Sequence, residues 1–112
     1  MNEFVLIYRG GQTREERSPA ELEASMKRWQ AWFAKLGEEG KLKDWGIPLQ
    51  SDGKHVAAGG IVTDGPYSEG KEVIGGFSVI IANDLAEAAE IAKGCPTFQT
   101  GGSVEVRPVI AM

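Results

Sequence analysis

The sequence predicts an α+β fold of the ferredoxin-like kind, in which a β-α-β-β-β-α-β order places both helices on one face of the sheet. Three observations predict this class: apolar runs of strand length near both ends and at residues 75–82, two segments with helix-start signals, and an Asp-Gly turn between two extended segments. A chain of 112 residues fits one domain, which we place over residues 1–112.

The first strand and the first helix are the clearest elements of the N-terminal half. Residues 4–8 form a nearly continuous apolar run, which the pair Gly-Gly at residues 10–11 ends. Residues 18–21 (Ser-Pro-Ala-Glu) then combine an N-cap, a proline at the first helical position and a capping box. Apolar residues follow at alternating spacings of four and three, on one stripe of the helix: Leu22, Met26, Trp29, Phe33 and Leu36. This stripe predicts that Trp29 is a core residue and that Trp32, one step off the stripe, faces a cleft or an interface.

Residues 42–110 supply the remaining elements. The extended segments 42–49 and 55–63 flank Ser-Asp-Gly-Lys at residues 51–54, which predicts a hairpin between them, and their glycines indicate an irregular one. Residues 75–82 form the strongest strand. Asp-Leu-Ala-Glu at residues 84–87 begins the second helix, and residues 103–110 form the last strand.

Several strands are apolar on both faces, as residues 4–7 and 79–81 show. Two helices on one side of the sheet cover only one of these faces. We therefore expect a homodimer in which a second copy of the chain covers the other face.

Charge and composition argue against several classes of function. The formal net charge of -4 disfavours direct nucleic-acid binding, which depends on Lys and Arg neutralising phosphates. Apolar runs of a few residues fall short of the ~20 that a membrane helix requires. A lone Cys95 and the lack of a secretory signal pattern favour a cytoplasmic location. With one His, one Cys and no phosphate loop, we expect no metal and no cofactor.

Residues 64–72 (Asp-Gly-Pro-Tyr-Ser-Glu-Gly-Lys-Glu) gather charged groups within nine positions. The candidate catalytic residues in this segment are Asp64, Glu69, Lys71 and Glu72. The same segment is also typical of an Asx turn followed by a solvated loop, or of a charged clasp between subunits. Both alternatives remain open from the residues alone.

Candidate ligand-binding residues come from that segment and from several strands. They are Arg107, Glu105, Tyr67, Trp45 and His55. Strand alternation places Glu105 and Arg107 on the face away from the helices, where they form either an interface ion-pair network or the polar floor of a cleft. An arginine in a cleft suits a carboxylate, because its planar fork binds such groups bidentately.

Three motifs together resemble the DGPF branch of the YCII-related family. They are the segment at residues 64–72, the Gly-Gly-aromatic run at residues 75–77 and Val-Glu-Val-Arg-Pro at residues 104–108. The resemblance implies a dimeric α+β barrel that binds a small, anionic molecule in a cleft at the sheet face, with cofactor-free acid–base chemistry of the lyase or isomerase kind. The alternative it implies is a non-catalytic regulatory module associated with an extracytoplasmic-function sigma factor in transcription initiation.

The chain departs from the broader YCII-related group at one pair of positions. That group typically has an Asp before the proline that follows the second helix, together with a His early in the first helix. Here Cys95 occupies the first position and the first helix contains no His. The catalytic pair of the broader group is therefore not carried over to this chain.

Overall fold

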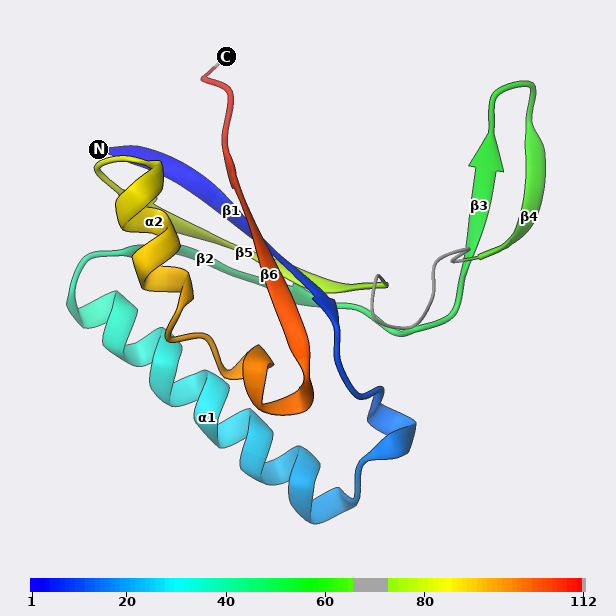
Figure 1. The fold of residues 1–112 in the computed structure, drawn as a ribbon, viewed down its shortest axis with the longest axis horizontal. Helices are drawn as coiled ribbons and strands as arrows, with labels where there is room; N and C mark the ends of the chain where they lie inside the picture. Colours follow the sequence, from blue (N-terminus) through cyan, green and yellow to red (C-terminus); the bar gives the residue numbers. More distant parts are fainter. Residues whose placement is uncertain (66–72, 112) are drawn as a thin grey trace.

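The computed structural model describes residues 1–65 and 73–111 (Figure 1). A four-stranded antiparallel sheet has the strand order β2-β5-β1-β6, and a second sheet pairs β3 with β4. The strands are β1 (Asn2–Gly10), β2 (Leu42–Pro48), β3 (Gly53–Ala57), β4 (Ile61–Gly65), β5 (Ile74–Ala82) and β6 (Gly102–Pro108). The helices are α1 (Pro19–Glu38) and α2 (Leu85–Ala92), with short 3-10 helices η1 (Arg14–Glu16) and η3 (Pro96–Thr100). The predicted ferredoxin-like α+β class is confirmed.

Both predicted helix starts are confirmed by their capping hydrogen bonds. The Ser18 hydroxyl accepts a hydrogen bond from the Glu21 backbone N–H at 3.2 Å. The Asp84 carboxylate accepts one from the Glu87 backbone N–H at 2.8 Å. Each cap satisfies a donor that the first helical turn leaves without a partner. None of the described helices is both long and apolar enough to cross a membrane.

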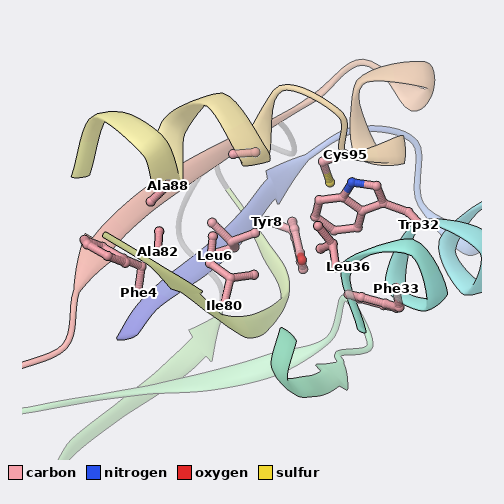
Figure 2. Close-up of a cluster of buried hydrophobic side chains, with 11 residues drawn as sticks. Phe4, Leu6, Tyr8, Trp32, Phe33, Leu36, Ile80, Ala82, Ala88 and Cys95 are labelled. Atoms are coloured by element: carbon pink, nitrogen blue, oxygen red, sulfur yellow. The ribbon is translucent and has the colours of Figure 1, made fainter. Parts of the chain in front are cut away.

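The hydrophobic core lies between the main sheet and the two helices (Figure 2). Every second residue of β1 enters it, as strand alternation requires. Its larger members are Phe4, Leu6, Tyr8, Trp32, Phe33, Leu36 and Ile80, and Ala82, Ala88, Ala92 and Cys95 complete it. The small side chains Ala88 and Ala92 of α2 pack in this core against the sheet.

The opposite face of the main sheet is apolar where β1 pairs with β5, and neither α1 nor α2 covers it (Figure 1). Val5 and Ile7 of β1 and Val79 and Ile81 of β5 alternate with core residues and are only half-buried. Phe77, at the start of the same row, is 37% exposed. We call these five residues the outer face. Its covering by a second copy stays a prediction.

The predicted hairpin between residues 42–49 and 55–63 is wrong. β2 pairs with β5 in the main sheet, and the segment 55–63 divides into β3 and β4, which pair with each other. The division falls at Gly59 and Gly60, whose φ angles of 87° and 79° suit a tight turn that other residues adopt with strain. The Asp-Gly pair at residues 52–53 only begins β3. The β3–β4 arm extends away from the main sheet (Figure 1).

The pairing of β2 with β5 is irregular because the two backbones approach closely at Gly46. The register shifts between Asp44 and Ile47, and the Asp44 carboxylate accepts a hydrogen bond from the Gly46 N–H at 2.8 Å. Gly46 has a φ of 79°, and a Cβ atom there would lie 1.5 Å from the carbonyl oxygen of Phe77. Only glycine fits this position without moving one of the strands.

We expect Gly46→Ala to lower the free energy of unfolding by about 3 kcal/mol or more, because β2 must separate from β5. Gly40→Ala is the matched control: Gly40 also has a positive φ of 71°, but nothing lies within 4 Å of the point that a Cβ atom would occupy there. In that variant the free energy of unfolding should fall only by what alanine costs in a left-handed backbone conformation, about 1 kcal/mol. Urea unfolding followed by circular dichroism measures both. Equal losses in the two variants would contradict the close approach of β2 and β5.

Candidate functional site

A cavity of about 520 Å³ opens on the helix side of the main sheet. It lies between α1 from Leu22 to Phe33, the turn after β1, the C-terminal end of β2 and the start of β5. Its aromatic lining residues include Tyr8, Trp29, Phe33 and Trp45, and its polar ones include Gln12, Arg14, Arg17, Ser25, Ser78 and Thr97. This size and this mixture of apolar walls with a few polar groups are typical of small-molecule sites.

The apolar wall of the cavity is a chain of aromatic rings from β1, α1 and β2. The ring of Trp29 meets Tyr8 edge-on at a centroid distance of 4.8 Å and lies 5.6 Å from Phe33. Phe33 in turn lies 5.1 Å from Trp45, with an angle of 31° between the ring planes. Trp45 remains 54% exposed. The wall therefore offers aromatic surface against which a planar ligand can pack.

One of the two predictions for the α1 tryptophans is wrong. Trp32, predicted to face a cleft or an interface, is 9% exposed and packs in the core. Trp29, predicted to be core, is partly buried and packs against the core, and it also lines the cavity. Met26, from the same predicted stripe, is exposed. The reason is that the start of α1 borders only the cavity, whereas the helix from Trp29 to Phe33 borders both the cavity and the core. A regular stripe cannot report this change along the helix.

A hydrogen-bond relay at the cavity joins three strands. The Tyr8 hydroxyl donates to the Ser78 hydroxyl at 2.8 Å, and the Ser78 hydroxyl donates to the backbone carbonyl of Trp45 at 2.7 Å. Tyr8 comes from β1, Ser78 from β5 and Trp45 from β2. Burial raises the pKa of the Tyr8 phenol above its ordinary value. Tyr8 is therefore a neutral hydrogen-bonding group and not a general base.

Arg17 places a positive charge at the cavity, immediately before the α1 N-cap. Its Nη1 donates to the Ser25 hydroxyl at 3.3 Å. Its Nε is buried and has no hydrogen-bond partner, and Arg17 forms no ion pair with any residue that the structure describes. A guanidinium in this state can accept an anionic group as its partner.

The predicted residues of the β3–β4 arm lie apart from the cavity. Asp64, whose side chain is 91% exposed, forms an ion pair with Lys54 across the arm. His55 is exposed on β3, opposite Thr63. Four further predicted residues fall outside the described residues: Tyr67, Glu69, Lys71 and Glu72. Their catalytic and binding roles stay predictions.

Trp45 is the predicted ligand-binding residue that lines the cavity, whereas Glu105 and Arg107 lie on β6 and point to the other side of the sheet. Glu105 accepts from Arg9 and from Arg107, each at 3.1 Å. The sequence left open an interface ion-pair network or the polar floor of a cleft for these residues. The cluster is an ion-pair network, and its place at an interface stays a prediction. Arg107 and Asp64 belong to different sheets, and their predicted binding and catalytic roles stay predictions.

Three cavity residues escaped prediction from the sequence: Tyr8, Arg17 and Ser78. Ser78 carried a usable signal, because it is a hydroxyl in the otherwise apolar strand at residues 77–82 and must find a partner when buried. Tyr8 carried a weaker one, as the polar-tipped end of an apolar run. Arg17 carried none, since an arginine before a helix cap is ordinary.

Metal binding and thiol chemistry gain no support from this part of the molecule. Within residues 1–65 and 73–111, no three His, Cys, Asp or Glu side chains lie close enough together to hold a metal ion. Cys95 is buried at the start of η3, and burial raises the pKa of its thiol to about 12. The thiolate that a nucleophilic mechanism needs is therefore scarce near neutral pH. Independence from metals and cofactors stays a prediction.

The raised pKa values of Cys95 and Tyr8 predict a loss of stability in alkali. Both groups bind their protons more tightly in the folded protein than in the unfolded chain, where they titrate near 9.0 and 10.0. Their contribution is complete below about pH 9 and falls as pH rises toward the folded values, by at most ~1.4 kcal/mol per pH unit for each group. Urea unfolding at pH 7 and pH 10.5 should show a smaller decrease for Cys95→Ala than for wild type. Equal decreases would contradict the Cys95 assignment.

Comparisons with known proteins place the chain in a family. Residues 3–112 match the YCII-related domain. An uncharacterized protein of Rhizobium meliloti (strain 1021) is 34% identical over 110 residues, covering 94% of this chain and 89% of that protein. Among solved structures, the 5-chloro-2-hydroxyhydroquinone dehydrochlorinase of Burkholderia phenoliruptrix AC1100, in complex with 2,5-dihydroxybenzoquinone, is similar at 20% identity and a TM-score of 0.43, over 96% of this chain and 93% of that one. The match over nearly the whole sequence agrees with the motifs: the chain belongs to the YCII-related domain family.

Proposed function

We propose that this protein binds a small ring-containing molecule in the cavity on the helix side of its sheet. The observation that carries the proposal is the aromatic wall of Trp29, Phe33 and Trp45 beside the polar relay that ends at Tyr8. A volume of about 520 Å³ suits a molecule of one or two rings. A purely regulatory module needs no such cavity, so this feature favours small-molecule binding over the sigma-factor association.

For a reaction, we propose cofactor-free acid–base chemistry of the lyase or isomerase kind. Tyr8 stays protonated and positions the ligand, so the proton-transfer step falls to carboxylates. Glu69 and Glu72 are the candidates from the sequence, and Val73, the next described residue after them, lines the cavity. Glu15 is a further carboxylate of the described lining.

We also propose that the protein is a homodimer. The half-buried apolar residues of the outer face support this arrangement, because a second sheet packed there would remove them from water. The charged cluster of Arg9, Glu105 and Arg107 lies on the same side and would border such a contact. The molar mass in dilute solution, measured by light scattering, separates a dimer from a monomer.

Single-tryptophan variants test whether the ligand enters this cavity. In one variant Trp45 remains while Trp29 and Trp32 are replaced by Phe, and in the matched control only Trp32 remains. Because Trp45 lines the cavity whereas Trp32 lies in the core behind Phe33, small phenols should quench the fluorescence of the first variant more strongly than that of the second. Circular dichroism confirms that both variants fold. Quenching of Trp32 alone, or of neither variant by any ring compound, would refute the proposal.

A further inference from the structure

We infer that the ligand of this cavity is an aromatic carboxylate that carries a hydroxyl group, with its carboxylate on Arg17 and its hydroxyl on Tyr8. The inference rests on the proposed function, because it concerns the same cavity, and it adds the chemical class of the ligand. Three features of the described lining define that class: a guanidinium, that of Arg17, with no ion pair among the described residues, a hydrogen-bond relay of fixed direction and an aromatic wall.

The guanidinium of Arg17 has no anionic partner among the residues that the structure describes. Arginine stays protonated in proteins and can only donate hydrogen bonds. The Ser25 hydroxyl accepts from Nη1 at 3.3 Å, and Nε is buried, so a ligand reaches the guanidinium through its Nη nitrogens. A carboxylate there can accept from both Nη nitrogens, which is a bidentate geometry that arginine favours.

The charge around Arg17 also favours an anion. Arg14 lines the same side of the cavity, and Glu15 is the only carboxylate in the described lining. This edge is therefore net positive although the whole chain carries a formal charge of -4. These arginines attract an anion at short range inside a partly enclosed cavity. Salt and water screen the repulsion from carboxylates elsewhere on the surface.

The direction of the relay determines what Tyr8 can bind. A backbone carbonyl can only accept, so the single hydroxyl proton of Ser78 is committed to the carbonyl of Trp45. The 2.8 Å contact between the two hydroxyls then requires Tyr8 to be the donor. The oxygen of Tyr8 keeps an acceptor site, and burial keeps the phenol neutral. The complementary ligand group is a donor, of which a hydroxyl is the simplest.

The aromatic wall distinguishes a ring from an aliphatic chain between these two contacts. Trp29, Phe33 and Trp45 present an extended aromatic surface, and about half of Trp45 is exposed. A planar ring gains both burial and ring–ring contact there, whereas a saturated ring gains the burial alone.

Matched probes test each contact by isothermal titration calorimetry. 4-Hydroxybenzoate offers all three features. 4-Hydroxybenzamide lacks the negative charge, benzoate lacks the hydroxyl, and 4-hydroxycyclohexanecarboxylate lacks the aromatic ring. In wild type we expect 4-hydroxybenzoate to bind at least about tenfold more tightly than its amide, because a charge-assisted bidentate contact is lost. This comparison does not depend on the folding of any variant.

Two arginine variants then assign the carboxylate contact. Arg17→Met should lower the affinity for 4-hydroxybenzoate about tenfold or more and leave the affinity for the amide unchanged. Arg28→Met is the matched control, because Arg28 also has a buried Nε without a partner but does not line the cavity. It should change neither affinity. Tyr8→Phe should remove the preference for 4-hydroxybenzoate over benzoate.

The outcomes separate this inference from the proposed function. If the amide binds as tightly as the acid and Arg17→Met does not change their ratio, the inference is overturned while the cavity remains a binding site. If Arg28→Met weakens the acid as much as Arg17→Met does, the assignment to Arg17 is likewise overturned. If no aromatic probe binds wild type, the proposed function fails and the inference fails with it.

Discussion

The hydrogen-bond relay from Tyr8 through Ser78 to the carbonyl of Trp45 is the interaction on which the site depends. It connects β1, β5 and β2 on the helix side of the sheet, at the end where the core gives way to the cavity. Buried polar groups are costly unless each has a partner, so this relay specifies one relative position of the three strands. The irregular pairing at Gly46 serves the same end, because it lets β2 lie close enough to β5 for the Trp45 carbonyl to reach Ser78.

The length of α1 explains why a small domain holds both a core and a cavity. The C-terminal half of this 20-residue helix supplies Phe33 and Leu36 to the core. Its N-terminal half supplies Leu22, Ser25 and Met26 to the cavity lining. Phe33 belongs to both, because its side chain is buried in the core and also lines the cavity. Substitutions near the start of α1 should therefore affect binding more than stability, whereas a change at Phe33 should affect both.

Local sequence signals predicted the elements of the fold well. The caps of both helices are short-range hydrogen-bond patterns, and strand alternation correctly placed Glu105 and Arg107 on the face away from the helices. The pairing of β2 was mispredicted because it depends on β5, a partner distant in the sequence, and the close contact of Gly46 with Phe77 left no mark in the sequence beyond a glycine.

Among the residues that the structure describes, the candidate site was predicted only at Trp45. Its other described members come from strands, α1 and the turns between them, and what makes them a site is the volume left between those elements, which no periodicity encodes. The sequence directed attention to charged residues such as Asp64 and Arg107, which the structure pairs with Lys54 and Glu105. Charge is visible in a sequence, whereas a buried hydroxyl relay and an unpartnered guanidinium Nε become visible only once the strands are placed.

Binding of the ligand on the helix side of the sheet is tested most directly by a crystal structure of the protein with 4-hydroxybenzoate. We expect density for the ring against Trp45, with the carboxylate on Arg17 and the hydroxyl within hydrogen-bond distance of the Tyr8 oxygen. Density on the other side of the sheet beside Arg107, with the helix-side cavity left to solvent, would contradict this assignment.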